Sequence, residues 1–322
     1  MADYKAIKGH LIETVAGDPS TLQLGDIWYN STLGKLRVAK ASAGSWATSN
    51  TYPHSVYGAN GCGLQTAALG FGGQPGGNAE SNEYNGTSWS AEADMNNGTY
   101  YVGSGAGTQT AAMWAGGKNP GAAVQDKSEE YNGSTWTDGN TTNKARQAAQ
   151  SIGVQTAALL IGGAPTGSPS VESYDGTNWT AGTDLNSPRT SGVAAGSNTA
   201  ALFYGGEDTA VRAYTEEWNG SAWAETTDQN TNRYGGAGWG ESTLCLLAGG
   251  YEGVTAYTET WNGTTWTEVA DMPSAKSAHG SSGGSTAAPH DAGITFTGSP
   301  SEVNTTEEWT VAAPVGANVT SS

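Results

Sequence analysis

An all-β fold built from a repeated unit is what this sequence predicts, on three observations. First, the motif Tyr/Trp-Asn/Asp-Gly-x-x-Trp occurs five times, and its closing tryptophans are spaced 47, 43, 44 and 43 residues apart. Second, a short apolar segment ending in two glycines precedes each copy. Third, the chain contains 48 Gly, 12 Trp and 14 Tyr and lacks a long helical pattern of Leu, Glu and Lys. A period near 44 residues with four short strands is typical of a β-propeller blade.

The elements of one unit follow in a fixed order. Strands are expected at 99–107, 110–117, 127–131 and 134–138. Asn-Gly between the last two strands predicts a two-residue type I′ turn, which would place Trp136 opposite Glu129 and diagonal to Tyr131, with both rings on one face. The aromatic pairs expected in this way are Tyr84 with Trp89, Tyr131 with Trp136, Tyr174 with Trp179, Trp218 with Trp223 and Trp261 with Trp266. The second glycines of the preceding strands are Gly73, Gly117, Gly163, Gly206 and Gly250.

A sixth unit is present but incomplete. Near the C-terminus Trp309 occupies the position of the third-strand aromatic, and no second tryptophan follows it. Trp46, however, lies 43 residues before Trp89, at the position of a blade tryptophan without its own blade. We therefore expect a six-bladed β-propeller over residues 44–322, closed by a strand at 44–49 that completes the last blade and leaves no open sheet edge. Residues 1–43 are expected to form a separate N-terminal β-hairpin segment.

Charged residues recur within the unit. Bases ten residues after the blade tryptophan are Arg146, Arg189, Arg233 and Lys276. Acids two residues before the third-strand aromatic are Glu129, Glu172, Glu216, Glu259 and Glu307. They could line one mouth of the central channel and hold an ion or an acidic ligand, or each base could pair with a glutamate or a carbonyl between neighbouring blades. We favour the second interpretation, because a feature repeated in nearly every blade serves the repeat.

The composition excludes several classes of function. Thirty acids against 13 bases give a formal charge of −17, which disfavours nucleic-acid binding. Cys62 and Cys245 are too few for a disulfide framework. Neither a signal peptide at the start nor an apolar run of membrane-spanning length is recognisable, so we expect no membrane span and synthesis in a cytoplasm.

No catalytic constellation stands out, and we expect a non-enzymatic protein without a cofactor or metal. The four histidines show no metal-ligand spacing, and no Gly-x-Ser-x-Gly motif occurs. Paired carboxylates of a glycan hydrolase remain open among 30 acids. The loops that follow the double glycines vary, and their Tyr214, Tyr251 and Tyr257 are either binding residues that stack on a sugar or ordinary surface aromatics.

The N-terminal part does not follow the repeat. Residues 22–40, LQLGDIWYNSTLGKLRVAK, alternate in the manner of a β-hairpin with a turn at 31–34. An isolated hairpin is only marginally stable, so this one should pack on the propeller or on another chain.

Two resemblances to known families follow from these motifs. The double glycine, the third-strand aromatic and the blade tryptophan resemble kelch repeats, most closely at 258–280, although kelch usually has one more residue between aromatic and tryptophan. Gly-Asp-Ile-Trp-Tyr-Asn, a short turn and Gly-Lys-Leu resemble a module of phage tail-fibre and other virion proteins. This implies a phage virion structural protein, a tail-fibre, appendage or capsid-surface component.

The second resemblance also implies partners. Residues 1–43 would attach to other virion proteins, and the propeller would make protein contacts or recognise a host-surface glycan or an outer-membrane component, as an adhesin does. The alternatives are a bacterial surface or secreted glycan-binding lectin and, less favoured, a glycan hydrolase.

Overall fold

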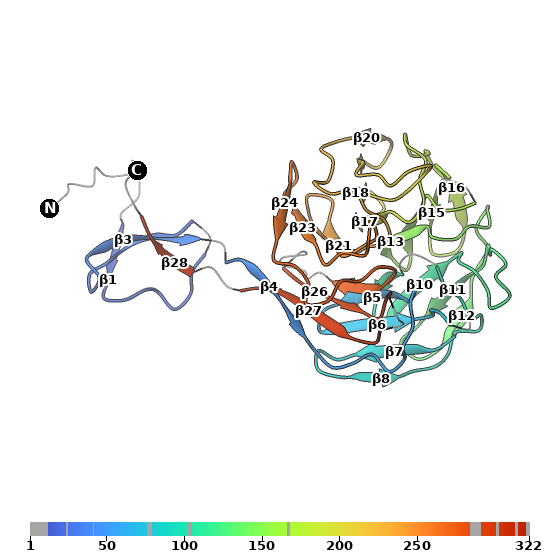
Figure 1. Cartoon of the computed structure of the whole chain (residues 1–322), viewed down its shortest axis with the longest axis horizontal. Coiled ribbons are helices and arrows are strands. Elements are labelled where there is room, and N and C mark those ends of the chain that lie inside the picture. Colours follow the sequence, from blue (N-terminus) through green and yellow to red (C-terminus); the bar gives the residue numbers. More distant parts are fainter. Residues whose placement is uncertain are drawn as a thin grey trace. The chain divides into compact units, whose positions relative to one another are not determined.

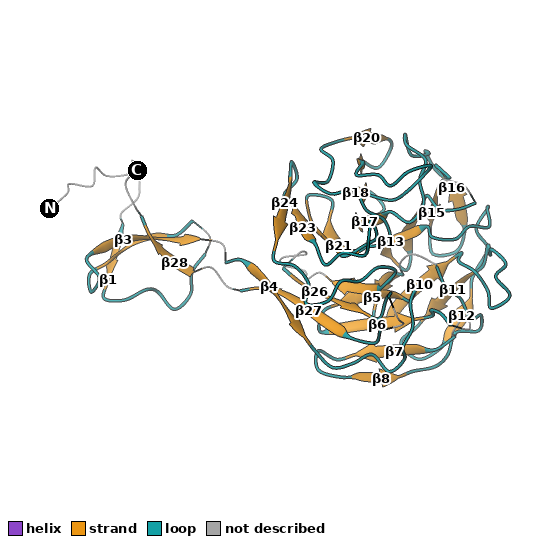
Figure 2. Ribbon diagram, in the orientation of Figure 1, coloured by secondary structure: helices purple, strands orange, loops and turns teal. Residues whose placement is uncertain are grey.

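The structure is a computed structural model that describes residues 12–23, 25–40, 42–75, 79–101, 105–165, 168–283, 291–300, 303–312 and 315–319. Within these ranges every regular element is a β-strand (Figure 2). The described residues therefore include no helix that could cross a membrane. The chain divides into two compact units, a larger one of Ser45–Thr310 and a smaller one of Met1–Gly44 with Val311–Ser322.

The described strands of the larger unit form six four-stranded sheets arranged in a ring like the blades of a propeller (Figure 1). Within each sheet, strands that follow one another in the chain pair side by side and antiparallel. The first three sheets are β5 (Asn60–Leu64), β6 (Ala67–Phe71), β7 (Ser81–Tyr84) and β8 (Trp89–Ala91); β9 (Ala106–Thr108), β10 (Ala111–Ala115), β11 (Ser128–Tyr131) and β12 (Trp136–Asp138); β13 (Gln150–Val154), β14 (Ala157–Ile161), β15 (Val171–Tyr174) and β16 (Trp179–Ala181). The other three are β17 (Val193–Gly196), β18 (Ala201–Tyr204), β19 (Thr215–Trp218) and β20 (Trp223–Glu225); β21 (Ala237–Glu241), β22 (Leu244–Ala248), β23 (Thr258–Trp261) and β24 (Trp266–Val269); β25 (Gly280–Gly283), β26 (Ala292–Phe296), β27 (Thr306–Val311) and β4 (Gly44–Thr48).

The sixth sheet joins the two ends of the larger unit. Its outermost strand is β4, which lies beside β27, and the rings of Trp46 and Trp309 are 5.5 Å apart. The first strands of successive sheets contact one another around the ring, and β25 contacts β5. Within the sixth sheet the backbone N–H of Ser49 donates to Thr306 O (2.8 Å), and across this last joint the indole N–H of Trp89 donates to Thr306 Oγ1 (2.9 Å). The ring of sheets is thus held closed by side-chain and backbone contacts.

The turn between the last two strands of a sheet differs from the predicted one. Tyr131 pairs directly with Trp136, so four residues, 132–135, connect the strands, and the predicted two-residue type I′ turn and diagonal register are wrong. The reason is the asparagine side chain: Asn132 Oδ1 accepts hydrogen bonds from the backbone N–H groups of Ser134 (3.0 Å) and Thr135 (2.9 Å). This Asx turn needs positive φ only at the glycine that follows.

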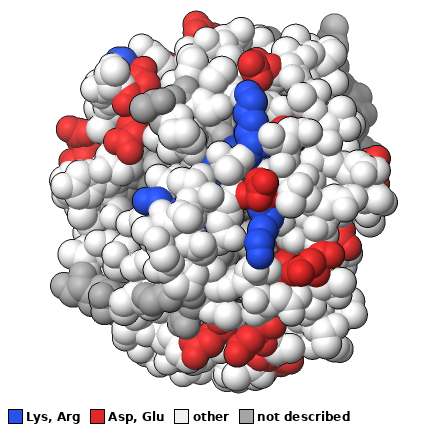
Figure 3. Space-filling view, turned by 90° about the vertical axis from the view of Figure 1, so that its right-hand side faces the viewer, with Lys and Arg blue, Asp and Glu red and all other residues white. Residues whose placement is uncertain are grey.

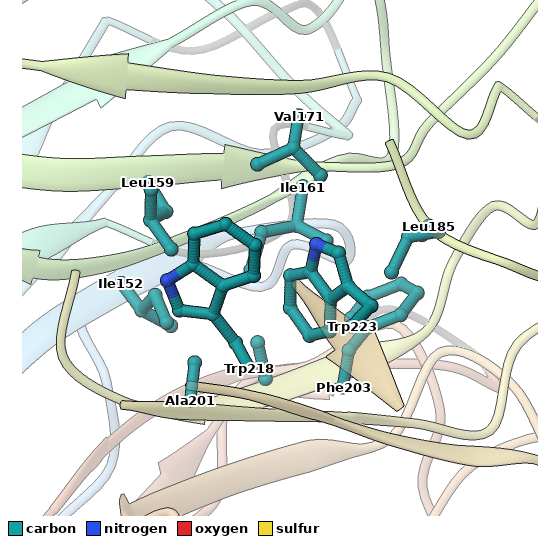
Figure 4. Packing of buried hydrophobic residues seen from close by; sticks show 10 residues of the cluster. Ile152, Leu159, Ile161, Val171, Leu185, Ala201, Phe203, Trp218 and Trp223 are labelled. Carbon is teal, nitrogen blue, oxygen red and sulfur yellow. The ribbon is translucent and has the colours of Figure 1, made fainter. Parts of the chain in front are cut away.

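Aromatic and aliphatic side chains fill the spaces between neighbouring sheets. Figure 4 shows one such cluster between the third and fourth sheets, where Trp218 and Trp223 lie against Leu159 and Phe203. The two rings of each strand pair lie 4.8–5.5 Å apart, as in Tyr174 with Trp179 and Trp261 with Trp266. Cys62 and Cys245 are free, buried packing residues. Burial of these large rings supplies the main stabilisation of each joint.

The smaller unit is a seventh sheet that the sequence predicts only in part. The expected hairpin is present as β2 (Ile27–Asn30) and β3 (Lys35–Lys40). To it are added β1 (Glu13–Val15), parallel to β2, and β28 (Val315–Asn318), antiparallel to β3. The predicted boundary is therefore wrong at its C-terminal end, since β28 belongs to this sheet and not to a propeller of residues 44–322. Residues 1–11 of the predicted segment lie outside the described part of the chain.

One carboxylate organises the smaller unit. Asp18 accepts hydrogen bonds from the Trp28 indole (3.1 Å) and the Asn30 amide (2.9 Å), and pairs with the Arg37 guanidinium (2.8 Å). The Asn30 hydrogen bond, with those of its neighbours, lowers the pKa of Asp18. Two side chains of the DIWYN segment, those of Trp28 and Asn30, are thus held by a single acceptor that precedes the segment in the chain.

Candidate functional site

A ring of backbone hydrogen bonds surrounds the axis of the larger unit. It is formed by six residues, one before the first strand of each sheet, with φ of 49–63°: Gly58, Tyr101, Ala148, Ser191, Gly235 and Ala278. The N–H of each donates to the carbonyl of the equivalent residue before the preceding sheet over 2.5–3.4 Å. Gly58 N donates to Ala278 O at 2.6 Å and so closes the ring. Four of the six residues are not glycine, so the hydrogen bonds compensate a left-handed conformation that costs about 1 kcal/mol or more per residue.

A cavity of about 240 Å³ lies at this ring. Its aromatic wall includes Tyr57, Tyr101, Tyr234 and Tyr251, and its polar wall includes Asn60, Gln150, Ser277 and His279. None of the described residues that line it is an aspartate, glutamate, lysine or arginine. A second, smaller cavity of about 120 Å³ is lined by the next residues along the first strands, many of them glycines, together with Trp239. The first cavity, which we call the mouth cavity, combines rings with hydrogen-bonding groups and is the candidate site.

The tyrosines of the mouth cavity pack in pairs. The rings of Tyr57 and Tyr101 are 6.1 Å apart, and those of Tyr234 and Tyr251 are 5.3 Å apart. Burial raises the pKa of Tyr101, and its tyrosine neighbours raise it further; the same causes act on Tyr234 with its acidic neighbours. These hydroxyls therefore stay protonated and can donate and accept hydrogen bonds at neutral pH.

Two polar side chains of the mouth cavity, Asn60 and His279, are buried. Asn60 has no hydrogen-bond partner among the described residues, and His279 is uncharged. Asn60 is 1% exposed, and neither its Nδ2 nor its Oδ1 forms a hydrogen bond with the described residues. Burial lowers the pKa of His279 to about 3, with a contribution from the positive charge of Lys276, so its imidazole is neutral. An unpaired buried amide is uncommon in a folded protein, because it costs about 1–3 kcal/mol.

The three tyrosines predicted as binding residues do not form one cluster. Tyr251 lines the mouth cavity and is 45% exposed. Tyr214 lies under the Arg212 guanidinium at 5.3 Å, and Arg212 in turn pairs with Asp208 at 2.9 Å. Tyr257 is 49% exposed and is not among the residues that line the cavity. Of the three, Tyr251 alone is placed where it could meet a ligand in the cavity.

The recurring charges lie between sheets. Each base follows the last strand of one sheet and meets a glutamate on the third strand of the next, in the pairs Arg146 with Glu172, Arg189 with Glu216, Arg233 with Glu259 (2.8 Å) and Lys276 with Glu307 (3.4 Å). All of these side chains are buried, and none lines either cavity. Glu129 has Thr99 in place of a base, and its carboxylate accepts from the backbone N–H groups of Asn96 and Asn97, both at 2.8 Å. The arrangement therefore holds neighbouring sheets together, and the described residues that line the two cavities include no Asp, Glu, Lys or Arg.

Other repeated contacts were not predicted from the sequence. Gln65, Gln109 and Gln155 each donate from Nε2 to the carbonyl of the third-strand aromatic of the preceding sheet, over 2.7–2.9 Å. Their recurrence in Gln-Thr-Ala before the second strand was a usable signal. The ring residues carry no such signal, because Tyr, Ala, Ser and Gly occupy equivalent positions.

Comparison with known proteins supports the fold. No model of a protein family and no curated protein sequence matches the chain. Among solved structures, that of YjhT is similar, with a TM-score of 0.67 and 10% sequence identity over 84% of this chain and 99% of that one. At this identity the likeness concerns the fold alone. Together with the ring of four-stranded sheets, it shows that the chain adopts an all-β, propeller-like fold.

Proposed function

We propose that this chain is a six-bladed, kelch-like propeller protein of a phage particle. In this proposal the smaller unit attaches to other virion proteins, and the mouth of the propeller recognises a host surface without catalysing a reaction. The observation that carries the proposal is that the two units present different kinds of surface. One is a small sheet with exposed apolar residues, and the other is a closed ring with an uncharged cavity.

The closed hydrogen-bond ring supports six blades. One residue before the first strand of each sheet of the larger unit belongs to it, and the bond from Gly58 to Ala278 has the same form as the other five. The kelch-like assignment rests on the double glycines and the aromatic pairs, and on the bases that pair across the joints. These contacts repeat in most joints, as expected of positions that build a blade.

Attachment through the smaller unit is supported by its surface. Ile27, Leu33, Val315 and Val319 are all exposed, the first and third in strands of the small sheet and the other two directly beside its strands. In the paired register Ile27, Val38 and Ala317 are adjacent, and Val315 lies two residues from Ala317, so these side chains share one face. Exposed apolar side chains grouped on one face are typical of protein contacts.

Recognition without catalysis is favoured by the protonation states at the mouth. A general acid or base is most effective when its pKa lies near the working pH. Burial instead moves the pKa values of His279 and Tyr101 away from neutrality, in opposite directions. The groups at the cavity are therefore suited to hydrogen bonding and poorly suited to proton transfer.

Mass spectrometry of purified phage particles tests the attachment. The full-length chain should be found in particles, and Val315→Asp should reduce its incorporation strongly by placing a charge on the apolar face. Val154→Asp is the matched control, because both valines are 52% exposed and Val154 lies in the larger unit. Absence of the wild-type chain from particles, or equal incorporation of both variants, would contradict the proposal.

The second candidate is a glycan-binding lectin of a bacterial surface. The exposed Tyr251 at an uncharged cavity favours it, since a tyrosine ring offers a sugar a flat apolar surface and a hydroxyl. Cell fractionation distinguishes the two: a lectin would be recovered with the envelope or the medium of uninfected cells, whereas a virion protein would be recovered with particles.

A further inference from the structure

We propose that the mouth cavity binds a single uncharged sugar ring at the end of a glycan. This inference deepens the proposed function and rests on it, because it names the ligand that the propeller would recognise. Tyr251 supported by Tyr234 is the stacking surface, and Asn60 and Gln150 supply hydrogen bonds from the wall.

The buried amide of Asn60 is the first argument. It lines the cavity and is almost fully buried, and its donor and acceptor are both unpaired among the described residues. A primary amide offers two N–H donors and a carbonyl acceptor. A sugar hydroxyl both donates and accepts, so two adjacent hydroxyls can satisfy one amide. Binding would then remove the destabilisation that an unpaired buried polar group carries.

The tyrosine pair is the second argument. Tyr234 and Tyr251 exchange backbone hydrogen bonds, with N–H to O distances of 2.8 and 3.3 Å, and their rings pack at 5.3 Å. Tyr251 nevertheless keeps 45% of its surface exposed beside the cavity. Its backbone and one side of its ring are thus fixed before a ligand arrives. A pre-formed aromatic surface loses little conformational freedom on binding.

The charge of the site is the third argument. None of the described lining residues is an aspartate, glutamate, lysine or arginine, and burial keeps His279 neutral. The whole chain carries a formal charge of −17, and acidic side chains lie in several groups on the side of the larger unit in Figure 3. An anionic ligand would find no lysine or arginine among the described lining residues to compensate its charge. Uncharged sugars are therefore preferred over uronic acids or phosphorylated sugars.

The size of the cavity is the fourth argument. Ligand sites in proteins usually measure about 300–1,000 Å³. At about 240 Å³ the mouth cavity lies just below this range, which fits one ring better than an internal stretch of a polymer. The remainder of a glycan would extend outward past Tyr251, which is the most exposed of its tyrosines.

The experiment is saturation-transfer NMR with the purified full-length chain. The probes are glucose, galactose, mannose, rhamnose and N-acetylglucosamine, and glucuronic acid is the anionic comparison. At least one uncharged sugar should receive saturation, and glucuronic acid should receive less than glucose. Titration of the best sugar then gives its Kd for the wild type and the variants.

Matched variants locate the site. Tyr251→Ala should weaken binding about tenfold, the upper end of what an aromatic contact contributes. Tyr257→Ala is the control, because Tyr257 is similarly exposed and lies outside the cavity lining. Asn60→Ala should also weaken binding and should not lower the melting temperature, because its amide has no hydrogen bond within the described structure to lose.

Three results would overturn the inference: saturation of no uncharged sugar, glucuronic acid binding as well as glucose, or equal weakening by Tyr257→Ala and Tyr251→Ala. Each of these leaves the incorporation of the chain into particles unaffected. Failure of the sugar-binding proposal is thus distinguishable from failure of the virion proposal, which is tested separately by mass spectrometry of particles.

Discussion

Arg189 lies at the joint between the third and fourth sheets, and its replacement by alanine should destabilise the larger unit. Its guanidinium is 0% exposed and pairs with Glu216. It also donates to the carbonyls of Ser187 (2.8 Å), Gly205 (2.9 Å) and Phe203 (3.0 Å), and it lies 4.7 Å from the centre of the Phe203 ring. Arg189→Ala removes all of these interactions at once and leaves a buried carboxylate.

The expected loss follows from what remains around that carboxylate. Removing one partner of a buried ion pair typically costs about 3–5 kcal/mol. Glu216 keeps the backbone N–H groups of Asn186 (2.8 Å) and Ser187 (3.2 Å), which places the loss near the lower end of that range. We expect the free energy of unfolding to fall by about 3 kcal/mol. Sugar binding should persist wherever the variant is folded, because Arg189 does not line the cavity.

The chain offers its own rescue for this variant. At the joint between the first and second sheets Thr99 takes the place of the arginine, and the side-chain amide of Asn97 donates to Glu129 at 2.8 Å. At the joint between the third and fourth sheets Ser187 is equivalent to Asn97, because the backbone N–H of each donates to the glutamate of its joint. Adding Ser187→Asn to Arg189→Thr should therefore recover about 1 kcal/mol relative to Arg189→Thr alone, the net value of one hydrogen bond.

Urea unfolding followed by tryptophan fluorescence measures these differences, with the midpoint shifting at constant m-value. Urea is preferable to guanidinium chloride, which would screen the ion pair. A loss below about 0.5 kcal/mol for Arg189→Ala, the usual effect of a neutral surface change, would refute the reasoning. Loss of sugar binding at unchanged stability would instead favour a role of these charges in ligand recognition.

Two further predictions concern closure and pH. Trp46→Ala should lower the free energy of unfolding in urea by about 3 kcal/mol, because Trp46 packs on Trp309 and donates to Thr258 Oγ1 at 3.1 Å. Trp179→Ala is the comparison and should give a similar loss. A much smaller loss for Trp46→Ala would mean that the closing strand contributes little to stability. His279 binds its proton in the unfolded chain near pH 6.5 and in the folded chain only near pH 3, so stability is lost as pH falls through this window, by up to about 1.4 kcal/mol per pH unit, and is regained as pH rises. His279→Asn should flatten the dependence between pH 6.5 and 5, and equal slopes for both proteins would contradict this assignment of the proton.

The repeat itself was predictable because its signals are local. Strand alternation, double glycines and aromatic pairs recur within one period, and the spacing of Trp46 from Trp89 is enough to place it beside Trp309. The pairing of β28 with β3 was not predictable, because strands more than 270 residues apart share no periodic landmark. The turn was mispredicted for a different reason. Asn-Gly permits both a type I′ turn and an Asx turn, and the register of the paired strands decides between them.

The hydrogen-bond ring at the mouth cavity could not be predicted from the sequence, because backbone atoms form it. Hydrogen bonds between N–H and carbonyl groups fix the ring without requiring any side chain, so its six positions are free to differ. The polar and aromatic contacts at the joints lack that freedom, because each depends on a matching residue in the next sheet. Tyr101 is an example of the freedom at the ring positions. A Cβ at Gly58 would lie 3.2 Å from the Tyr101 ring, so the glycine at one ring position makes room for the tyrosine at the next. The ring positions therefore differ where a ligand would bind, while most of the surrounding joints keep the repeated contacts that hold neighbouring sheets together.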